Sequence, residues 1–153
     1  MRQLFREYRQ WLYDHRDTAA GSESSVKAGL AMVDGLIRNL PGDYGPPDGE
    51  VLLWYEDQSL VACGALRRIE PGVGEIKRIH VRPDYRGKEF GPPFVRALIS
   101  RAHELGFERL QVDTLSTMTA AIEFYQELGF RPIPAFWPHP AAGARFFECR
   151  IIE

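Results

Sequence analysis

The sequence has little cysteine and no long apolar segment, and both shortages narrow the kind of protein it encodes. Its two cysteines, Cys63 and Cys149, lie far apart in apolar runs without CxxC spacing, which favours buried, inert thiols over a metal site or a disulfide. No apolar run approaches the length of a membrane span, and the N-terminal stretch is too charged for a signal peptide. We therefore expect a cytoplasmic protein with no metal site and no membrane partner.

The sequence also lacks an excess of either charge and lacks the common nucleotide-binding loops. The formal net charge is −2 with both signs interspersed, so no basic block is present that would bind nucleic acid. Neither GxGxxG nor GxxxxGKS/T occurs, and there is no internal repeat or low-complexity tract. We expect no nucleic acid among the partners of this protein.

What the sequence does contain is enough apolar material for one compact core. Its 153 residues and 44% hydrophobic content predict a single domain over residues 1–153. Apolar residues at helical spacing predict helices over 2–16, 25–40, 92–106 and 118–129. Strand-like runs bounded by turns lie at 50–56, 60–69, 75–82, 109–114, 130–133 and 144–152.

The order of these elements predicts an α/β fold with a mixed sheet. Short turns join the early strands, which are therefore antiparallel to one another. The helix over 92–106 is a crossover, and it makes the strand before it parallel to the strand after it. The loop between 82 and 92 then lies at the C-terminal end of a strand, where open α/β sheets bind their ligands.

That loop reads Arg86-Gly87-Lys88-Glu89-Phe90-Gly91 and leads directly into a helix. Backbone N–H groups and a partial positive charge at a helix N-terminus favour a phosphate. The carboxylate of Glu89 opposes this only if it points inward, because such a cradle works through backbone groups. Pro92 and Pro93 remove two donors yet fit the first helical turn. We expect a phosphate to bind, less tightly than on an all-glycine loop; a ligand-free turn is the alternative.

A second motif, Tyr125-Gln126-Glu127-Leu128-Gly129-Phe130, ends the last predicted helix. The loop over 86–91 and this motif occur in this order, with a helix and a strand between them. Together they make the run from Glu75 to Ile133 resemble the core of the GNAT superfamily of N-acetyltransferases. The resemblance implies a twisted, mostly antiparallel mixed sheet with one parallel, splayed strand pair and helices on both faces. The family usually begins with a strand before its first helix, whereas this chain begins in a helical pattern.

The resemblance also implies an activity and a donor. Family members use acetyl-coenzyme A as the acyl donor, and the acetyl group passes by direct attack to a primary amine of a small molecule or a peptide. The loop over 86–91 would bind the donor's pyrophosphate through the residues quoted above. The pantetheine arm would pair with the preceding strand at Ile79, His80 and Val81.

Three residues are candidates for proton transfer. Tyr125 of the second motif would protonate the departing thiolate. Glu75 stands where related enzymes often place a general base, and His80 is the alternative because its intrinsic pKa is near ~6.5. Strand alternation places Glu75 and His80 on opposite faces, so only one of them faces the substrate unless a bulge intervenes.

Five residues are candidates for the acceptor site. Asp113 and Thr114 end the strand after the crossover helix, and Asp113 could steer a cationic amine, although capping the next helix is the alternative role. Phe136, Trp137 and His139 lie in a loop rich in proline and aromatic residues that forms either a wall of the acceptor site or a structural loop.

Two readings of function therefore stand, with the acceptor unidentified and a homodimer possible. The first is the N-acetyltransferase. The second is a non-catalytic acyl-coenzyme A-binding or interaction domain, in which Glu89 and the two prolines have weakened the loop.

Overall fold

The computed structural model describes residues 2–14, 27, 31, 34–35, 37–86, 90–138 and 143–151. Its helices are α1 (Arg2–Asp14), α3 (Gly91–Glu104) and α4 (Thr119–Glu127), with 3-10 turns at Gly42–Tyr44 and Pro83–Tyr85. Its strands are β1 (Gly49–Glu56), β2 (Ser59–Glu70), β3 (Val73–Val81), β4 (Arg109–Leu115), β5 (Arg131–Ile133) and β6 (Ala144–Arg150). Of the helix expected over 25–40, the described positions at 27, 31, 34–35 and 37–39 are helical.

The strands form one sheet in the order β1-β2-β3-β4-β6-β5. β3 and β4 are parallel and are joined by the crossover helix α3, and the other neighbouring pairs are antiparallel. The β1–β2 turn is made by Asp57 and Gln58, whose φ angles of 44° and 66° match the twist of a two-residue hairpin. The predicted mixed, mostly antiparallel sheet is confirmed. In the described residues the sheet begins with β1, after α1.

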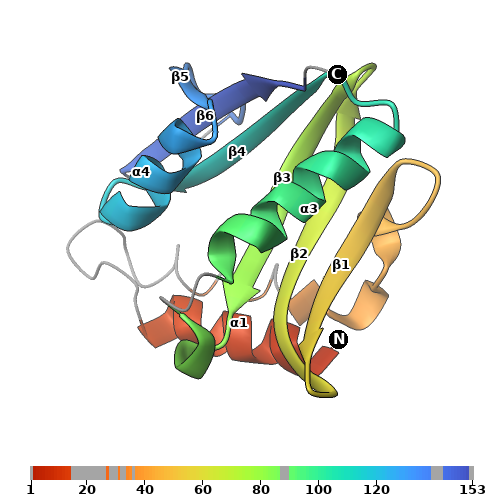
Figure 1. The fold of residues 1–153 in the computed structure, drawn as a ribbon, viewed down its shortest axis with the longest axis vertical. Helices are drawn as coiled ribbons and strands as arrows, with labels where there is room; N and C mark the ends of the chain where they lie inside the picture. Colours follow the sequence, from red (N-terminus) through yellow and green to blue (C-terminus); the bar gives the residue numbers. More distant parts are fainter. Residues whose placement is uncertain are drawn as a thin grey trace.

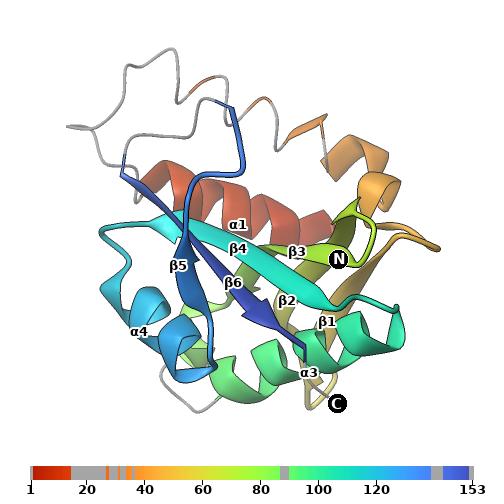
Figure 2. The same cartoon turned by 90° about the horizontal axis from the view of Figure 1, so that it is seen from above.

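Helices cover both faces of the sheet (Figure 1). Figure 2 shows α1 on one face and α3 with α4 on the other, and we name these the α1 face and the α3 face. The larger core lies on the α3 face, where Phe94 and Leu98 of α3 pack with Ile76 of β3. The smaller core, on the α1 face, includes Leu4, Cys63 and Ala65. Within the described residues, no helix has both the length and the apolar character needed to cross a bilayer.

β3 contains a bulge. Two of its residues, Arg78 and Ile79, lie opposite the single residue Gly64 of β2. Arg78 has a φ of +58°, a left-handed conformation that residues with a side chain seldom adopt. The Cys63 thiol donates to the carbonyl oxygen of Arg78 at 3.6 Å. Burial raises the pKa of Cys63 to about 12, so this thiol keeps its proton and supports the bulge.

β3 and β4 are paired only in their first halves. The register begins with Val73 opposite Arg109 and ends with Ile76 opposite Val112. Figure 1 shows the two strands side by side at one end and diverging toward α1. The bulge follows directly after the last pair and turns β3 away from β4. Residues 77–81 of β3 and 113–115 of β4, which do not pair with each other, form what we term the splay. It agrees with the splayed strand pair that the resemblance implied.

The helix α1 is tied to the end of β3 by a charged pair. Both Arg82 Nε and Arg82 Nη2 donate to the carboxylate of Glu7 at 2.8 Å. This hydrogen bonding to Arg82 lowers the pKa of Glu7. The two side chains are about one-third exposed. The pair fixes α1 beside the splay, because Tyr8 follows Glu7 on the same helical turn.

We expect Glu7→Gln to lower the free energy of unfolding by about 1 kcal/mol, because a charge-assisted fork becomes a pair of weaker bonds. The carboxylate's pKa is lower in the folded state, so its contribution is present above the unfolded pKa and is lost as the pH falls through the folded pKa. Denaturant unfolding at pH 7 and below pH 4 tests this. Glu56→Gln, at an exposed position of β1, is the control. An equal loss in both variants at pH 7 would contradict the assignment.

Candidate active site

The bulge places Glu75, Lys77 and His80 on one face of the sheet. Lys77 and His80 lie opposite Ala65 and Cys63, which belong to the core of the α1 face. Glu75 lies two residues before Lys77, on the same side of the strand. The sequence placed Glu75 and His80 on opposite faces unless a bulge intervened; a bulge does intervene, and its extra residue reverses the alternation between them.

Glu75 is fully buried between two cations. Arg67 Nε donates to Glu75 Oε2 at 2.7 Å, and Lys77 Nζ lies 3.1 Å from Oε1. Oε1 accepts no hydrogen bond, since the approach of Lys77 lacks hydrogen-bond geometry. Two opposite charges offset the cost of burying this carboxylate. One oxygen of Glu75 thus keeps its capacity to accept a proton.

His80 is buried on the same face, with 4% of its surface exposed. Its ring packs edge-on against Tyr8 of α1, at 5.8 Å between centroids. Burial and, to a smaller extent, the nearby charge of Arg86 lower the pKa of His80 to about 4. The imidazole is therefore neutral at pH 7, and its Nε2 has no hydrogen-bond partner.

Tyr125 lies on α4, buried in the core of the α3 face between the rings of Phe124 and Phe130. Burial raises its pKa, and the neighbouring Tyr8 and Asp113 raise it further. Tyr8 belongs to α1, on the opposite face of the sheet. The splay is where β3 and β4 do not close the sheet between them.

Two residues at the splay carried no signal in the sequence. Tyr8 occupied an apolar position of the α1 pattern, and Arg78 looked like an ordinary strand residue. Burial raises the pKa of Tyr8, while a hydrogen bond with Arg78 acts in the opposite direction. Burial also disfavours the charge of Arg78, but hydrogen bonds and charges of Tyr44 and Tyr8 raise its pKa overall. A permanent cation therefore lies at the bulge.

Asp113 lies at the first position of the splay on β4. Its Oδ1 accepts a bond of 2.5 Å from Lys77 Nζ, which joins the two strands just beyond their last backbone pair. The alternative role as a helix cap is wrong, because α4 begins after Met118 without any side-chain cap. Thr114 is opposite Arg145 of β6.

The structure describes only part of the expected phosphate loop. Gly87, Lys88 and Glu89 lie outside the described residues. Arg86 Nε donates to the carbonyl oxygen of Val81 at 2.8 Å, at the end of β3. Ile79 and Val81 pack against the core of the α3 face, in the part of β3 that does not pair with β4.

The first turn of α3 offers few backbone donors. Phe90 is the N-cap and its ring packs against Tyr85, while Pro92 and Pro93 have no N–H. The N–H of Phe94 already donates to the carbonyl of Phe90 at 3.2 Å. A Cβ built on Gly91 meets no atom within 4 Å, so the backbone here is open to close approach.

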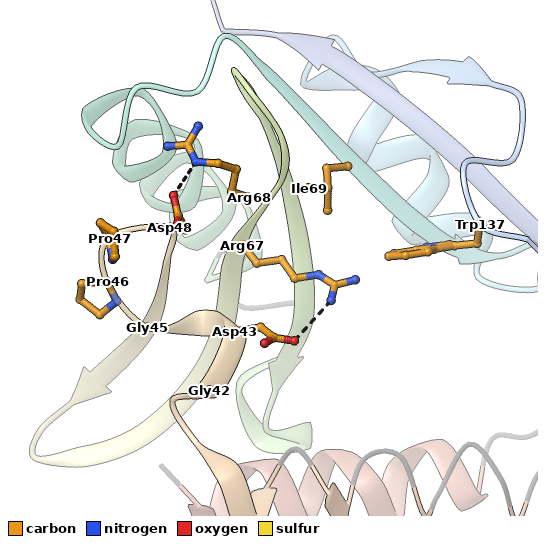
Figure 3. Close-up of a pocket in the computed structure, with 10 residues that line it drawn as sticks. All are labelled: Gly42, Asp43, Gly45, Pro46, Pro47, Asp48, Arg67, Arg68, Ile69 and Trp137. Atoms are coloured by element: carbon orange, nitrogen blue, oxygen red, sulfur yellow. Dashed lines mark hydrogen bonds and ion pairs between the residues drawn. The ribbon is translucent and has the colours of Figure 1, made fainter.

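The loop between β5 and β6 brings Trp137 over the two cations that hold Glu75. Arg67 Cζ and Lys77 Nζ lie 5.0 Å and 5.1 Å from the centre of its ring. Phe136 packs between Trp137 and the buried Phe146 and so anchors the loop. His139 lies outside the described residues. Figure 3 shows Trp137 at the edge of a pocket of about 520 Å³, lined also by residues between 42 and 48 and by 67–69.

Buried polar atoms without a hydrogen bond gather around this centre. In the described chain they include Oε1 of Glu75 and of Gln111, Nε of Arg78, Nε2 of His80 and Nε1 of Trp137. Gln111 is opposite Glu75 on β4, and the others lie on the α1 face or beside it. Native interiors leave few such atoms, and their concentration is typical of a functional site.

Comparisons with known proteins agree with this geometry. A sequence model described as the acetyltransferase (GNAT) family matches residues 2–130. An uncharacterised N-acetyltransferase of Schizosaccharomyces pombe is 32% identical over 110 residues, covering 71% of this chain and 68% of the relative.

Two solved structures share the fold. A GNAT-family acetyltransferase from Staphylococcus aureus superposes with a TM-score of 0.76 and 18% identity, covering 99% of this chain and 93% of its own. The PaiA N-acetyltransferase from Thermoplasma acidophilum, crystallised with coenzyme A, has a TM-score of 0.72 and 16% identity. The match covers 97% of this chain and 89% of the PaiA chain. The expected acyl donor, acetyl-coenzyme A, agrees with that complex. The matched sequence, the splayed sheet and the shared fold lead to one conclusion: this chain belongs to the GNAT family of acetyltransferases.

Proposed function

We propose that residues 1–153 form one domain that transfers an acetyl group from acetyl-coenzyme A to a primary amine by direct attack. The observation that carries this proposal is the buried, protonated phenol of Tyr125 beside the splay of β3 and β4, where the sheet is open. Family membership supports the reaction class, and the acceptor is a small-molecule or peptide amine.

The donor would bind at the end of β3 and the start of α3. Its pyrophosphate would lie on the loop over 86–91, where Gly91 permits close approach. The pantetheine arm would run along residues 77–81, whose edge toward β4 has no strand partner. This places the thioester at the bulge, beside the permanent cation of Arg78.

The chemistry then needs one acid and one base. The amine attacks the carbonyl carbon, a C–N bond forms, the C–S bond breaks, and the ammonium proton leaves to a base. The raised pKa of Tyr125 keeps its phenol protonated, so it can bond to the sulfur and deliver a proton as the thiolate departs. Oε1 of Glu75 and Nε2 of His80 make no hydrogen bond within the described residues, and either could take the ammonium proton, directly or through water.

A second function also has specific support. Pro92 and Pro93 reduce the donors at the start of α3, and Glu75 is neutralised by Arg67 and Lys77. These features suit a domain that binds acyl-coenzyme A without turnover. The two functions differ in whether free thiol is produced.

Thiol release from acetyl-coenzyme A with a panel of amines should rise above the blank for at least one amine. With that amine, Tyr125→Phe should lower kcat by roughly 10²-fold or more and leave coenzyme affinity nearly intact, because lost acid catalysis costs about 10²–10⁴. Single-turnover measurement isolates the chemical step, and Phe124→Leu is the packing control. Tight coenzyme binding with no thiol release for any amine would favour the second function. An unchanged single-turnover rate in Tyr125→Phe removes Tyr125 from the mechanism.

We expect Glu75→Gln to flatten the acid limb of the kcat/KM profile, and His80→Gln to leave it in place. The pKa of His80 is about 4, so a limb governed by His80 would fall only near that pH. Profiles from pH 4 to 9, with melting temperatures as a check on folding, separate the two. The opposite pattern would exchange the roles, and no effect from either variant would mean that the amine arrives deprotonated.

Coenzyme A should raise the melting temperature in a concentration-dependent manner, and dephosphorylated pantetheine should do so far less, because the pyrophosphate is bound by backbone groups. Gly91→Val should abolish this shift without unfolding the domain, since no described residue lies within 4 Å of a Cβ at Gly91. Gly91→Ala is the milder control. Wild-type protein that ignores coenzyme A at millimolar concentration would contradict both functions.

A further inference from the structure

A row of alternating charges runs from the pocket of Figure 3 to the splay. Asp43 Oδ2 lies 3.9 Å from Arg67 Nη1, and Arg67 Nε bonds to Glu75 at 2.7 Å. Glu75 lies 3.1 Å from Lys77, which bonds to Asp113 at 2.5 Å. Each member touches the next, so the row connects the pocket with the place where the thioester would react.

Arg67 has an edge that is available to a ligand. Glu75 occupies its Nε, whereas the 3.9 Å between Nη1 and Asp43 exceeds a hydrogen bond. Within the described chain neither Nη group makes a hydrogen bond, and the side chain is 23% exposed. Asp43 is 73% exposed and so is free to turn toward solvent. Figure 3 shows Arg67 extended toward Trp137 across the pocket.

The neighbouring Arg68 is held differently. It bonds to Asp48 at 2.7 Å and lies over the ring of Phe107, 4.7 Å from its centre. Figure 3 shows it turned away from Trp137. Of these two arginines, Arg67 is therefore the one whose Nη groups are available to a ligand on the side of the pocket near Trp137.

Trp137 fixes the two cations of the row in place. Its ring contacts Arg67 and Lys77 at almost equal distances, and Phe136 holds the ring against Phe146. Rigid placement of a guanidinium reduces the entropy lost when it binds a ligand. The indole N–H of Trp137 is buried and has no acceptor. The Nη groups of Arg67 and the indole N–H of Trp137 are therefore donors that suit a ligand with hydrogen-bond acceptors, such as an anion.

We propose that the acceptor is an amine with a carboxylate close to its nitrogen, as in a free amino acid, and that Arg67 binds this carboxylate. The proposal rests on the proposed function and specifies its substrate class. A carboxylate matches the two parallel Nη donors of Arg67. The ammonium then lies toward Asp113, whose Oδ2 makes no hydrogen bond within the described residues. Arg67 and Lys77 share the carboxylate of Glu75, so the carboxylate and the ammonium of the ligand would bind to members of the same row of charges.

The commonest macromolecular acceptors lack such a carboxylate. The N-terminal amine of a peptide is followed by an amide, and the side-chain amine of a lysine in a protein has no nearby carboxylate. Neither offers Arg67 an anionic partner. A pocket of about 520 Å³ is large enough for an amino-acid side chain beside the charged groups.

Matched acceptors test the proposal. The common amino acids are assayed first, and each one that reacts is compared with its decarboxylated amine and with its amide. For phenylalanine these are 2-phenylethylamine and phenylalaninamide. We expect kcat/KM to be roughly 10- to 100-fold higher for the amino acid, as for one charge-assisted bidentate contact. Arg67→Lys keeps a cation beside Glu75 but loses the planar fork, so it should reduce this ratio by about tenfold or more. Arg68→Gln should preserve the ratio.

Several outcomes would overturn the proposal while leaving the acetyltransferase intact. These are equal rates for the amine and the amino acid, a ratio unchanged in Arg67→Lys, or a preference for phosphoethanolamine over every amino acid. Binding provides a separate readout. With coenzyme A bound, the amino acid should raise the melting temperature of wild type and not of Arg67→Lys. If no amine releases thiol, the proposed function fails, and this thermal shift alone decides whether Arg67 binds a carboxylate.

Discussion

One backbone irregularity, the extra residue at Arg78 in β3, determines the arrangement of the candidate active site. It ends the pairing of β3 with β4 and moves His80 to the face that carries Glu75. The left-handed φ of Arg78 costs roughly 1–2 kcal/mol relative to an ordinary strand conformation. The thiol of Cys63 and the hydroxyls of Tyr8 and Tyr44 bond to this residue and offset that cost.

Burial of charge organises the α1 face. A carboxylate as buried as Glu75 is stable only with cations beside it, and those cations, Arg67 and Lys77, are in turn held by Trp137. Pairs of this kind contribute little net stability, but they fix the position and orientation of their members. The result is a set of charged groups held in fixed positions on the α1 face of the sheet.

Local signals in the sequence were sufficient for the elements and for the mixed sheet, because apolar periodicity, turns and the crossover helix act over short distances. The residues of the site were harder to place. The side of the strand on which His80 lies depends on one inserted residue, and no residue type marks a bulge at Arg78. The partner of Asp113 is Lys77, 36 positions earlier, which only the tertiary fold brings near. Tyr8 was indistinguishable from a core tyrosine for the same reason.

The short edge strand β5 has a consequence for how this protein could diversify. It has only three residues and pairs solely with β6, and the loop that follows it carries Phe136 and Trp137. The elements expected to bind coenzyme A lie elsewhere, on β3 and α3. Insertions or replacements in the loop can therefore change the groups around Arg67 while the coenzyme half keeps its sequence. Evolution could alter the choice of acceptor in this protein without having to rebuild donor recognition.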